Sequence, residues 1–371
     1  MFSQDFIPGH GGNLFQAAKH YGFLPQEIID FSANINPLGP SAKVIKAITD
    51  NLWQIRHYPD PDCTLIRQAL SLHLNMPPDN LLVGNGTSEL IYLLAETLKI
   101  RHALILPPAF SEYARAVFTR GGKVSQVELN EENDFSLPLA ELTKAIPEVE
   151  ALFLCNPNNP TGSLISREEL KVILDTAARY NRSVIVDEAF MDFVPQKENY
   201  TALPCLDNYP NLIVLYSLTK ILAIPGLRLG IIAASSSLIK KLARAKIPWS
   251  VNTLAQIAGK AGLEDEEYLM NTYRLVNQEK DFLSRRLNKL PGLKPLPGAA
   301  NFLLIDITKT GYGVRELVRK LGTKGILVRD CTNFSGLFRS YIRIAVRGRE
   351  ENKVLLAALQ EILGVDHKVE D

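Results

Sequence analysis

Cysteine is scarce and scattered in this sequence. The four cysteines among 371 residues are Cys63, Cys155, Cys205 and Cys331, and their spacing matches neither a metal site nor a disulfide framework. The pattern argues against a zinc module or a disulfide-stapled domain. We expect four reduced thiols in a cytoplasmic protein.

Long apolar runs and an excess of charge of one sign are also missing. The longest apolar run, NLIVLYSL, has the length of a strand, well short of the roughly 18 residues that span a bilayer. The start, MFSQDFIPGHGGNLF, has no basic segment before an apolar core, so no signal peptide is expected. The 41 basic and 40 acidic side chains nearly cancel. We therefore expect no membrane and no nucleic-acid partner.

The length exceeds what one hydrophobic core usually supports, so two domains are expected. The middle of the chain alternates apolar, strand-sized runs with helical patterns, one of which begins with a capping box at Ser166 and Glu169. Strand–helix–strand units give parallel strands. We predict a large, doubly wound α/β domain over residues 45–255 and a small α/β domain over 256–371. Residues 1–44 are expected to join the small domain.

Polar residues stand where the predicted parallel strands end. Asn159 follows the run ALFLC, Asp187 ends SVIVD, and Ser217, Thr219 and Lys220 follow NLIVLY. In an open α/β sheet, ligands bind at the carboxyl ends of the strands. We therefore expect these side chains to converge on one ligand.

The stretch GNGTSE, with Gly86 and Thr87, is a glycine turn that opens a helix, and such a terminus can bind phosphate. A glycine turn that binds nothing is an equally good interpretation of this motif alone. Arg228, close to Ser217 and Lys220 in sequence, suits a forked grip on phosphate. Together these residues favour a phosphorylated cofactor.

Lys220 and Asp187 suggest which cofactor this is. A desolvated lysine has a lowered pKa and attacks carbonyl groups, and a buried aspartate can keep a pyridine nitrogen protonated. Pyridoxal 5'-phosphate needs both partners. Taken alone, Lys220 could also be an ordinary lysine that reaches solvent. Asp187 alone could cap a helix or pair with a basic residue at the surface.

The set GNGTSE, NPNNPTG, DEAF, SLTK and PGLRLG resembles the fold-type-I pyridoxal-phosphate enzymes of the aminotransferase superfamily. The resemblance implies that Lys220 carries the cofactor covalently, that Asp187 pairs with the ring nitrogen, and that Asn159 bonds the ring hydroxyl. It implies further cofactor contacts from Gly86, Thr87, Phe110, Ser217, Thr219 and Arg228, with Phe110 stacked on the ring.

The resemblance also has implications for Tyr58 and Phe190. Tyr58, in RHYPD, resembles the tyrosine that reaches the cofactor phosphate of a neighbouring subunit, so a homodimer is implied. Phe190 stands where the family often has a tyrosine that also bonds the ring hydroxyl. Asn159 is then expected to be the sole side-chain partner of that hydroxyl.

Within the superfamily, HGGN, DFSANINPLG, RHYPDPD, DEAF and IPWSVN resemble the threonine-phosphate decarboxylases of cobalamin biosynthesis. The histidinol-phosphate aminotransferases usually have DEAY and lack the early HGG. The resemblance implies decarboxylation of L-threonine O-3-phosphate to (R)-1-amino-2-propanol O-2-phosphate. The implied substrate contacts are His10, Asn36, Arg329, Arg343 and Arg347. A histidinol-phosphate-type aminotransferase and an inactive cofactor-binding regulatory or scaffold protein are the alternatives.

Overall fold

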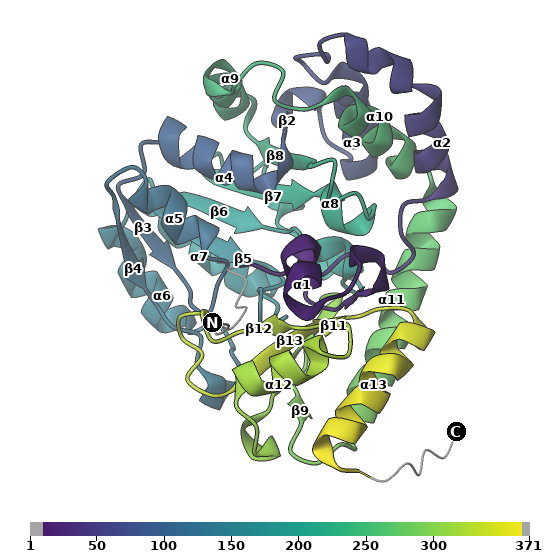
Figure 1. Cartoon of the computed structure of the whole chain (residues 1–371). Coiled ribbons are helices and arrows are strands. Elements are labelled where there is room, and N and C mark those ends of the chain that lie inside the picture. The colour runs from purple at the N-terminus through teal and green to yellow at the C-terminus, as the bar shows by residue number, and fades with distance from the viewer. Residues whose placement is uncertain (1–9, 366–371) are drawn as a thin grey trace.

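The computed structural model describes residues 10–365, and within them the largest element is a seven-stranded sheet (Figure 1). Its strands, from edge to edge, are β2 (Leu81–Gly84), β8 (Gly230–Ala234), β7 (Leu212–Ser217), β6 (Ser183–Asp187), β5 (Ala151–Cys155), β3 (His102–Ile105) and β4 (Lys123–Gln126). Strands β3 to β7 run parallel, whereas β8 is antiparallel to both of its neighbours. The predicted α/β fold is confirmed, with a mixed rather than purely parallel sheet.

Helices cover both faces of this sheet. On one face, alternate strand residues such as Ile185 and Ile213 pack with α4 (Gly86–Thr97), α5 (Glu112–Phe118) and α9 (Ser236–Ala245). On the other face, Val184 and Val214 share a core with α3 (Thr64–Leu74), α6 (Leu139–Ala145), α7 (Arg167–Arg179) and α10 (Thr253–Leu263). Burial on both faces explains why the strands are continuous apolar runs.

Helix α7 shows how local sequence fixes an element. The Ser166 hydroxyl accepts a hydrogen bond from the Glu169 backbone N–H at 3.2 Å, and the Glu169 carboxylate accepts one from the Ser166 N–H at 2.8 Å. This reciprocal pair confirms the predicted capping box. The buried face of the helix consists of Leu170, Ile173, Leu174 and Ala177.

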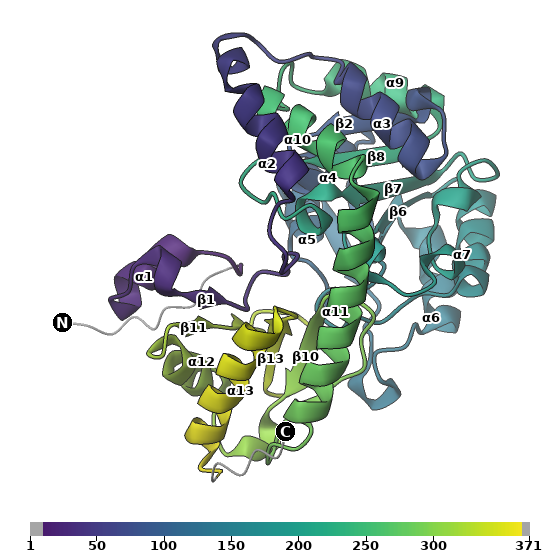
Figure 2. The same ribbon diagram turned by 90° about the vertical axis from the view of Figure 1, so that its right-hand side faces the viewer.

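A smaller sheet lies below the large one. Its strand order is β12 (Arg329–Asp330), β13 (Tyr341–Ala345), β10 (Phe302–Asp306) and β9 (Lys294–Pro295), and its pairs are antiparallel. Helices α12 (Val314–Gly322) and α13 (Arg349–Leu363) pack on it. The long helix α11 (Glu266–Leu287) runs from the large sheet to the small one (Figure 2).

The N-terminal segment lies against the small sheet. It contains α1 (Leu14–Tyr21) and β1 (Ile29–Asp30), and β1 pairs in parallel with β11 (Ile326–Leu327), as Figure 2 shows. Helix α2 (Ala42–Asp50) follows and packs on α10. The boundaries at residues 44 and 255 stay a prediction. No helix within residues 10–365 combines the length and apolarity that crossing a bilayer requires.

Candidate active site

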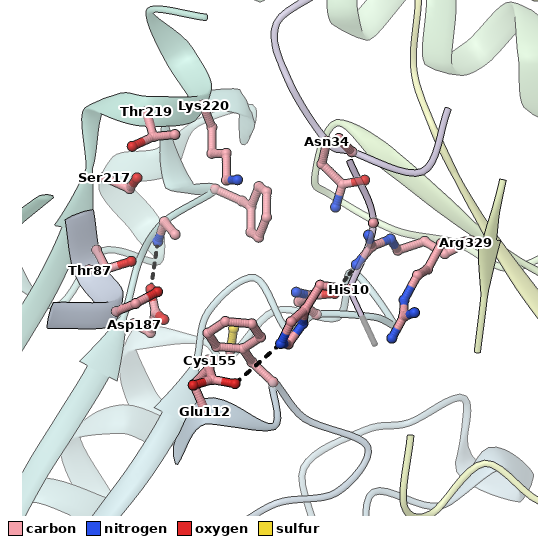
Figure 3. Close-up of a pocket in the computed structure, with 18 of the residues that line it drawn as sticks. His10, Asn34, Thr87, Glu112, Cys155, Asp187, Ser217, Thr219, Lys220 and Arg329 are labelled. Carbon is pink, nitrogen blue, oxygen red and sulfur yellow. Dashed lines mark hydrogen bonds and ion pairs between the residues drawn. The ribbon is translucent and has the colours of Figure 1, made fainter. Parts of the chain in front are cut away.

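A cavity of about 450 Å³ opens between the carboxyl ends of the large sheet, the small sheet and the N-terminal segment. One wall, which we call the sheet wall, carries Thr87, Asp187, Ser217, Thr219 and Lys220 (Figure 3). Arg228 lines the cavity on the same side and is counted with this wall. The facing wall carries His10, Asn34, Arg329 and Arg343, which we call the cationic wall. The cavity therefore has two chemically distinct sides.

Lys220 lies on the sheet wall in the short helix α8 (Leu218–Ile221), directly after β7. Burial, together with the positive charges of Arg228 and Arg343, lowers the pKa of its ammonium group to about 8. The negative charge of Asp187 acts in the opposite direction. A lysine with this pKa is partly neutral near pH 7 and is suited to attack an aldehyde.

Asp187 ends β6 and is 4% exposed. Its carboxylate accepts hydrogen bonds from the Tyr113 hydroxyl at 2.7 Å and from the Ala189 backbone N–H at 3.0 Å. Burial nevertheless raises the pKa of this carboxyl group. A buried carboxylate at a cavity wall is thus ready to pair with a cation, as the protonated nitrogen of a pyridine ring would be.

A phosphate cradle forms beside these two residues. Helix α4 begins at Gly86, whose φ of +80° is a conformation that favours glycine. A Cβ at Gly86 would lie only 2.6 Å from Nη2 of Arg228, so the guanidinium lies directly against the helix start. The free N–H groups of this helix start and the guanidinium suit a phosphate. Ser217 and Thr219 line the same cavity, although the Thr219 hydroxyl also donates to the Leu229 carbonyl at 3.2 Å.

Phe110 and Asn159 lie on the cavity wall as well. Phe110 is an edge-to-face neighbour of Tyr113, with ring centroids 5.7 Å apart. The Asn159 side-chain oxygen accepts a hydrogen bond from Arg343, so its amide N–H₂ is the part that remains for a ring hydroxyl. Phe190 lines the cavity too and packs edge-to-face on Phe302. These residues and the cradle fit pyridoxal phosphate.

The cationic wall is held from several elements. Arg343, in β13, donates to the Ser32 carbonyl at 3.0 Å, and its buried Nε has no hydrogen-bond partner among residues 10–365. Arg329, in β12, donates to the Asn333 side chain at 2.7 Å and lies over the Phe334 ring. Burial lowers the pKa of Arg343 to about 10. An anionic ligand would relieve the cost of burying this charge.

Two predicted substrate contacts lie outside the cavity wall. Asn36 is 1% exposed, and its amide donates to the Ile221 carbonyl, to Tyr268 and to Thr272 at 2.7–2.8 Å. These bonds tie the N-terminal segment to α11 and leave the amide no donor for a ligand.

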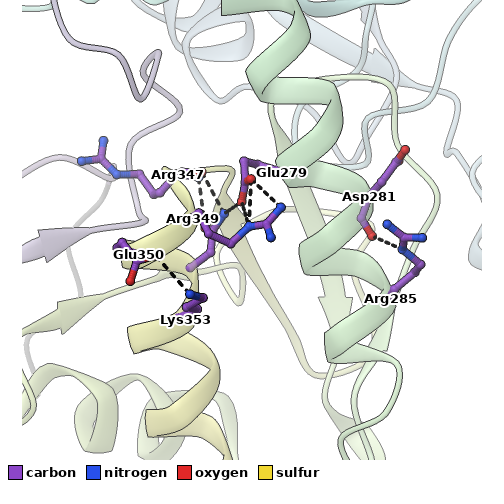
Figure 4. A network of polar contacts seen from close by, with 8 residues as sticks. Glu279, Asp281, Arg285, Arg347, Arg349, Glu350 and Lys353 are labelled. Atoms are coloured by element: carbon purple, nitrogen blue, oxygen red, sulfur yellow. Dashed lines mark hydrogen bonds and ion pairs between the residues drawn. The ribbon is translucent and has the colours of Figure 1, made fainter. Parts of the chain in front are cut away.

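Arg347, the other predicted contact, pairs with Glu351 at 2.6 Å. It lies beside the network in which Glu279 binds Arg349 and Asn352 (Figure 4). The Arg347 side chain is thus paired with the first turns of α13 and does not line the cavity.

Tyr58 is also remote from the cavity wall. It is 80% exposed and stacks on Trp249 with ring centroids 4.7 Å apart. Its predicted role needs a second subunit, so its position in one chain neither supplies nor removes that role.

The structure adds cavity residues that the sequence analysis missed. Asn34, two positions before Asn36, is 3% exposed, and its side-chain oxygen has no hydrogen-bond partner among the described residues. Tyr113 and Glu112 stand three and two residues after Phe110. Phe110 precedes α5, which begins at Glu112, so helical spacing could not have grouped its ring with that of Tyr113.

Comparison with known proteins assigns the family. The model of aminotransferase class I and II matches residues 26–359. The chain belongs to this family. It is 41% identical to a threonine-phosphate decarboxylase of Salmonella typhimurium over 96% of this chain and 97% of that protein.

Two solved structures of similar fold differ in their chemistry. One is an L-threonine-O-3-phosphate decarboxylase from Porphyromonas gingivalis, with 29% identity, a TM-score of 0.79, and coverage of 90% of this chain and 99% of that one. The other is a histidinol-phosphate aminotransferase from Clostridium acetobutylicum, with 27% identity, a TM-score of 0.84, and coverage of 90% and 98%. Backbone similarity thus does not separate the two reactions.

Proposed function

We propose that the protein is a pyridoxal-phosphate-dependent decarboxylase that converts L-threonine O-3-phosphate to (R)-1-amino-2-propanol O-2-phosphate and CO2, for cobalamin biosynthesis. The observation that carries the proposal is the two-sided cavity, with a lysine of pKa about 8 facing His10, Arg329 and Arg343. The 41% identity to a threonine-phosphate decarboxylase supports it.

The sheet wall would hold the cofactor. Bound pyridoxal phosphate supplies an aldehyde for an amine and an electron-poor ring that accepts the electron pair of a bond broken at Cα. Lys220 would carry the aldehyde at its ε-nitrogen and release it to the substrate amine, and Asp187 would keep the ring nitrogen protonated. Gly86, Thr87, Ser217, Thr219 and Arg228 would bind the phosphate, Asn159 the ring hydroxyl, and Phe110 the ring face.

The cationic wall would orient the substrate. An enzyme of this class breaks the Cα bond that it holds perpendicular to the cofactor ring, so orientation selects the reaction. Arg343, Arg329, His10 and Asn34 would bind the carboxylate and the phosphate, and the remote phosphate would help to fix the pose. CO2 would leave with cleavage of its bond to Cα, and a proton would return to that carbon from Nζ of Lys220 or from water.

A histidinol-phosphate-type aminotransferase is the second candidate, favoured by the TM-score of 0.84 to such an enzyme. Incubation of the cofactor-loaded protein with threonine phosphate, and separately with histidinol phosphate and 2-oxoglutarate, distinguishes the two. We expect CO2 from the first mixture. Glutamate from the second mixture without CO2 from the first would refute the decarboxylase proposal. Cofactor binding with turnover in neither mixture would favour an inactive regulatory or scaffold protein.

We further propose a cytoplasmic homodimer in which Tyr58 reaches the cofactor phosphate of the second copy. Support comes from exposed large apolar side chains near Tyr58, at Trp53, Ile55, Ile247 and Trp249. Sedimentation equilibrium of the wild type and of Trp53→Glu tests the dimer. A wild-type monomer that is fully active would contradict it.

A further inference from the structure

Glu112 is a buried carboxylate on the cavity wall. It begins α5, is 8% exposed, and has a different partner for each oxygen. Oε2 accepts a hydrogen bond from the Tyr92 hydroxyl at 2.8 Å, and Oε1 lies 3.2 Å from Nε2 of His10. Arg115, on the same helix, approaches Oε1 at 3.7 Å from an exposed position. Tyr92 therefore fixes the carboxylate so that the other oxygen serves His10.

The backbone next to His10 is fixed independently, from the opposite side. A Cβ at Gly11 would lie 2.0 Å from the Ser32 carbonyl oxygen, so only glycine allows this approach. The Gly12 N–H donates to the Ser32 hydroxyl at 2.9 Å, and that hydroxyl donates to Asp30 at 2.6 Å. His10 thus bridges the N-terminal segment and α5, with its ring 5.8 Å from that of Phe110.

We propose that Glu112 is a positioning residue that orients His10 for the phosphate group of the substrate. This inference takes the identity of the substrate from the proposed function. With Nε2 directed to the carboxylate, Nδ1 is the ring nitrogen that remains for a ligand. In Figure 3, His10 lies between Glu112 and Arg329, at the end of the cavity away from Lys220.

The pairing of Glu112 with His10 and Tyr92 explains how a carboxylate can line a cavity that binds an anion. An unscreened carboxylate there would repel a phosphate, whereas one that is paired with His10 and Tyr92 has both oxygens engaged and faces the ligand through the imidazole. The other charged groups around His10 are Arg115 on α5, Arg329 in β12, and Asp30, which contacts Ser32. A purely structural role, in which Glu112 only stabilises the start of α5, is the competing interpretation.

A double-mutant cycle on the cofactor-loaded protein separates the two roles. The variants are Glu112→Gln, His10→Ala and both together, with Glu168→Gln as the matched control, because Glu168 is an exposed acid in the first turn of α7. The probe is O-phosphoethanolamine, which carries the phosphate but no carboxylate, and its affinity is measured by calorimetry. We expect Glu112→Gln to weaken binding about tenfold, as loss of one charge-assisted bond would.

Three results accompany this expectation. In the His10→Ala background, Glu112→Gln has no further effect on binding. With threonine phosphate, Glu112→Gln raises KM and leaves kcat within about twofold, since an interaction made equally in ground and transition states affects KM alone. Glu112→Asp and the milder Tyr92→Phe fall between wild type and Glu112→Gln.

An equal loss of affinity from Glu112→Gln with and without His10 would overturn the inference, as would an unchanged affinity with only a lowered melting temperature. A wild type that does not bind O-phosphoethanolamine would overturn it as well. The proposed function is tested separately, because it fails when the wild type releases no CO2 from threonine phosphate. Binding of O-phosphoethanolamine can be scored whatever that assay shows.

Discussion

The two walls of the cavity are built in different ways. The sheet wall uses residues 87–228, and its key groups stand at or just after the ends of strands of one sheet. The cationic wall combines residues 10–34 with residues 329–343. These meet because β1 pairs with β11 and the Phe31 carbonyl accepts a hydrogen bond from the Ala345 N–H of β13. Sheet topology alone places the first wall, whereas the second depends on tertiary packing. Chemistry should therefore fail when the sheet wall is changed, and substrate binding when the cationic wall is changed.

Lys220→Ala should have the largest effect. It removes the only side chain proposed to bond the cofactor covalently, so we expect the rate of CO2 release to fall by a factor of about 10³ or more. Borohydride treatment followed by mass spectrometry should find cofactor attached to the wild type but not to the variant. Lys241→Ala, at an exposed site on α9, is the control. Full-rate decarboxylation by Lys220→Ala would contradict the mechanism.

Arg329→Gln tests the other wall. Because Arg329 is proposed to bind substrate rather than cofactor, we expect KM for threonine phosphate to rise about 10- to 100-fold, as loss of a charged contact does. The covalent link to Lys220 should stay intact in the borohydride assay. Arg319→Gln, on the exposed face of α12, should match wild type. Loss of the link in Arg329→Gln would show that the walls are not independent.

The difference between the two walls also determines which site residues could be predicted from the sequence. The sequence predicts Asp187 and Lys220 at one sheet edge because parallel strands present their carboxyl ends together, and the structure places both at the cavity. The family resemblance predicts Asn36 as a substrate contact, but Asn34 lines the cavity and Asn36 does not. Both asparagines stand in one irregular segment, and only the bonds of Asn36 to α8 and α11 distinguish them.

The direction of β8 and the roles of Glu112 and Tyr113 cannot be predicted from the neighbouring sequence. The run GIIAA predicts a buried strand but not its direction, so the antiparallel β8 follows only from the whole sheet. Glu112 and Tyr113 stand in the stretch SEYARAVF, whose pattern indicates a helix and nothing more. Their importance depends on Asp187, 74 residues from Tyr113, and on His10, 102 residues from Glu112.

The pH dependence of cofactor uptake tests whether the cationic wall affects Lys220. Burial and the charges of Arg228 and Arg343 lower the lysine pKa to about 8, so the reactive neutral amine accumulates as pH rises and is dominant above 8. The rate at which cofactor-free protein takes up pyridoxal phosphate, followed by absorbance, should rise about tenfold from pH 7 and level off near pH 8–9. An ordinary lysine would gain up to pH ~10.4.

Arg343→Gln sharpens this test. Removing a positive charge that faces Lys220 should move the plateau to higher pH, whereas the control Arg319→Gln should leave it in place. A plateau that Arg343→Gln does not move would mean that burial and Arg228 set the lysine pKa without Arg343. The two walls would then be electrostatically separate.

Tyr113→Phe should have the smallest effect, confined to the sheet wall. The change removes the hydroxyl that donates to Asp187 at 2.7 Å and keeps the ring that stacks on Phe153. Burial raises the Asp187 pKa and the Tyr113 bond lowers it, so its loss raises that pKa further. The carboxylate would then be lost at a higher pH as the solution is acidified. We expect kcat to fall about three- to tenfold, as loss of one hydrogen bond to a charged group does, with the acid limb of the kcat profile moved to higher pH.

Tyr209→Phe, which breaks a 2.7 Å bond to Asp175 away from the cavity, is the matched control. A rise in KM without a change in kcat would place Tyr113 with the substrate contacts, and the division between the two walls would have to be redrawn.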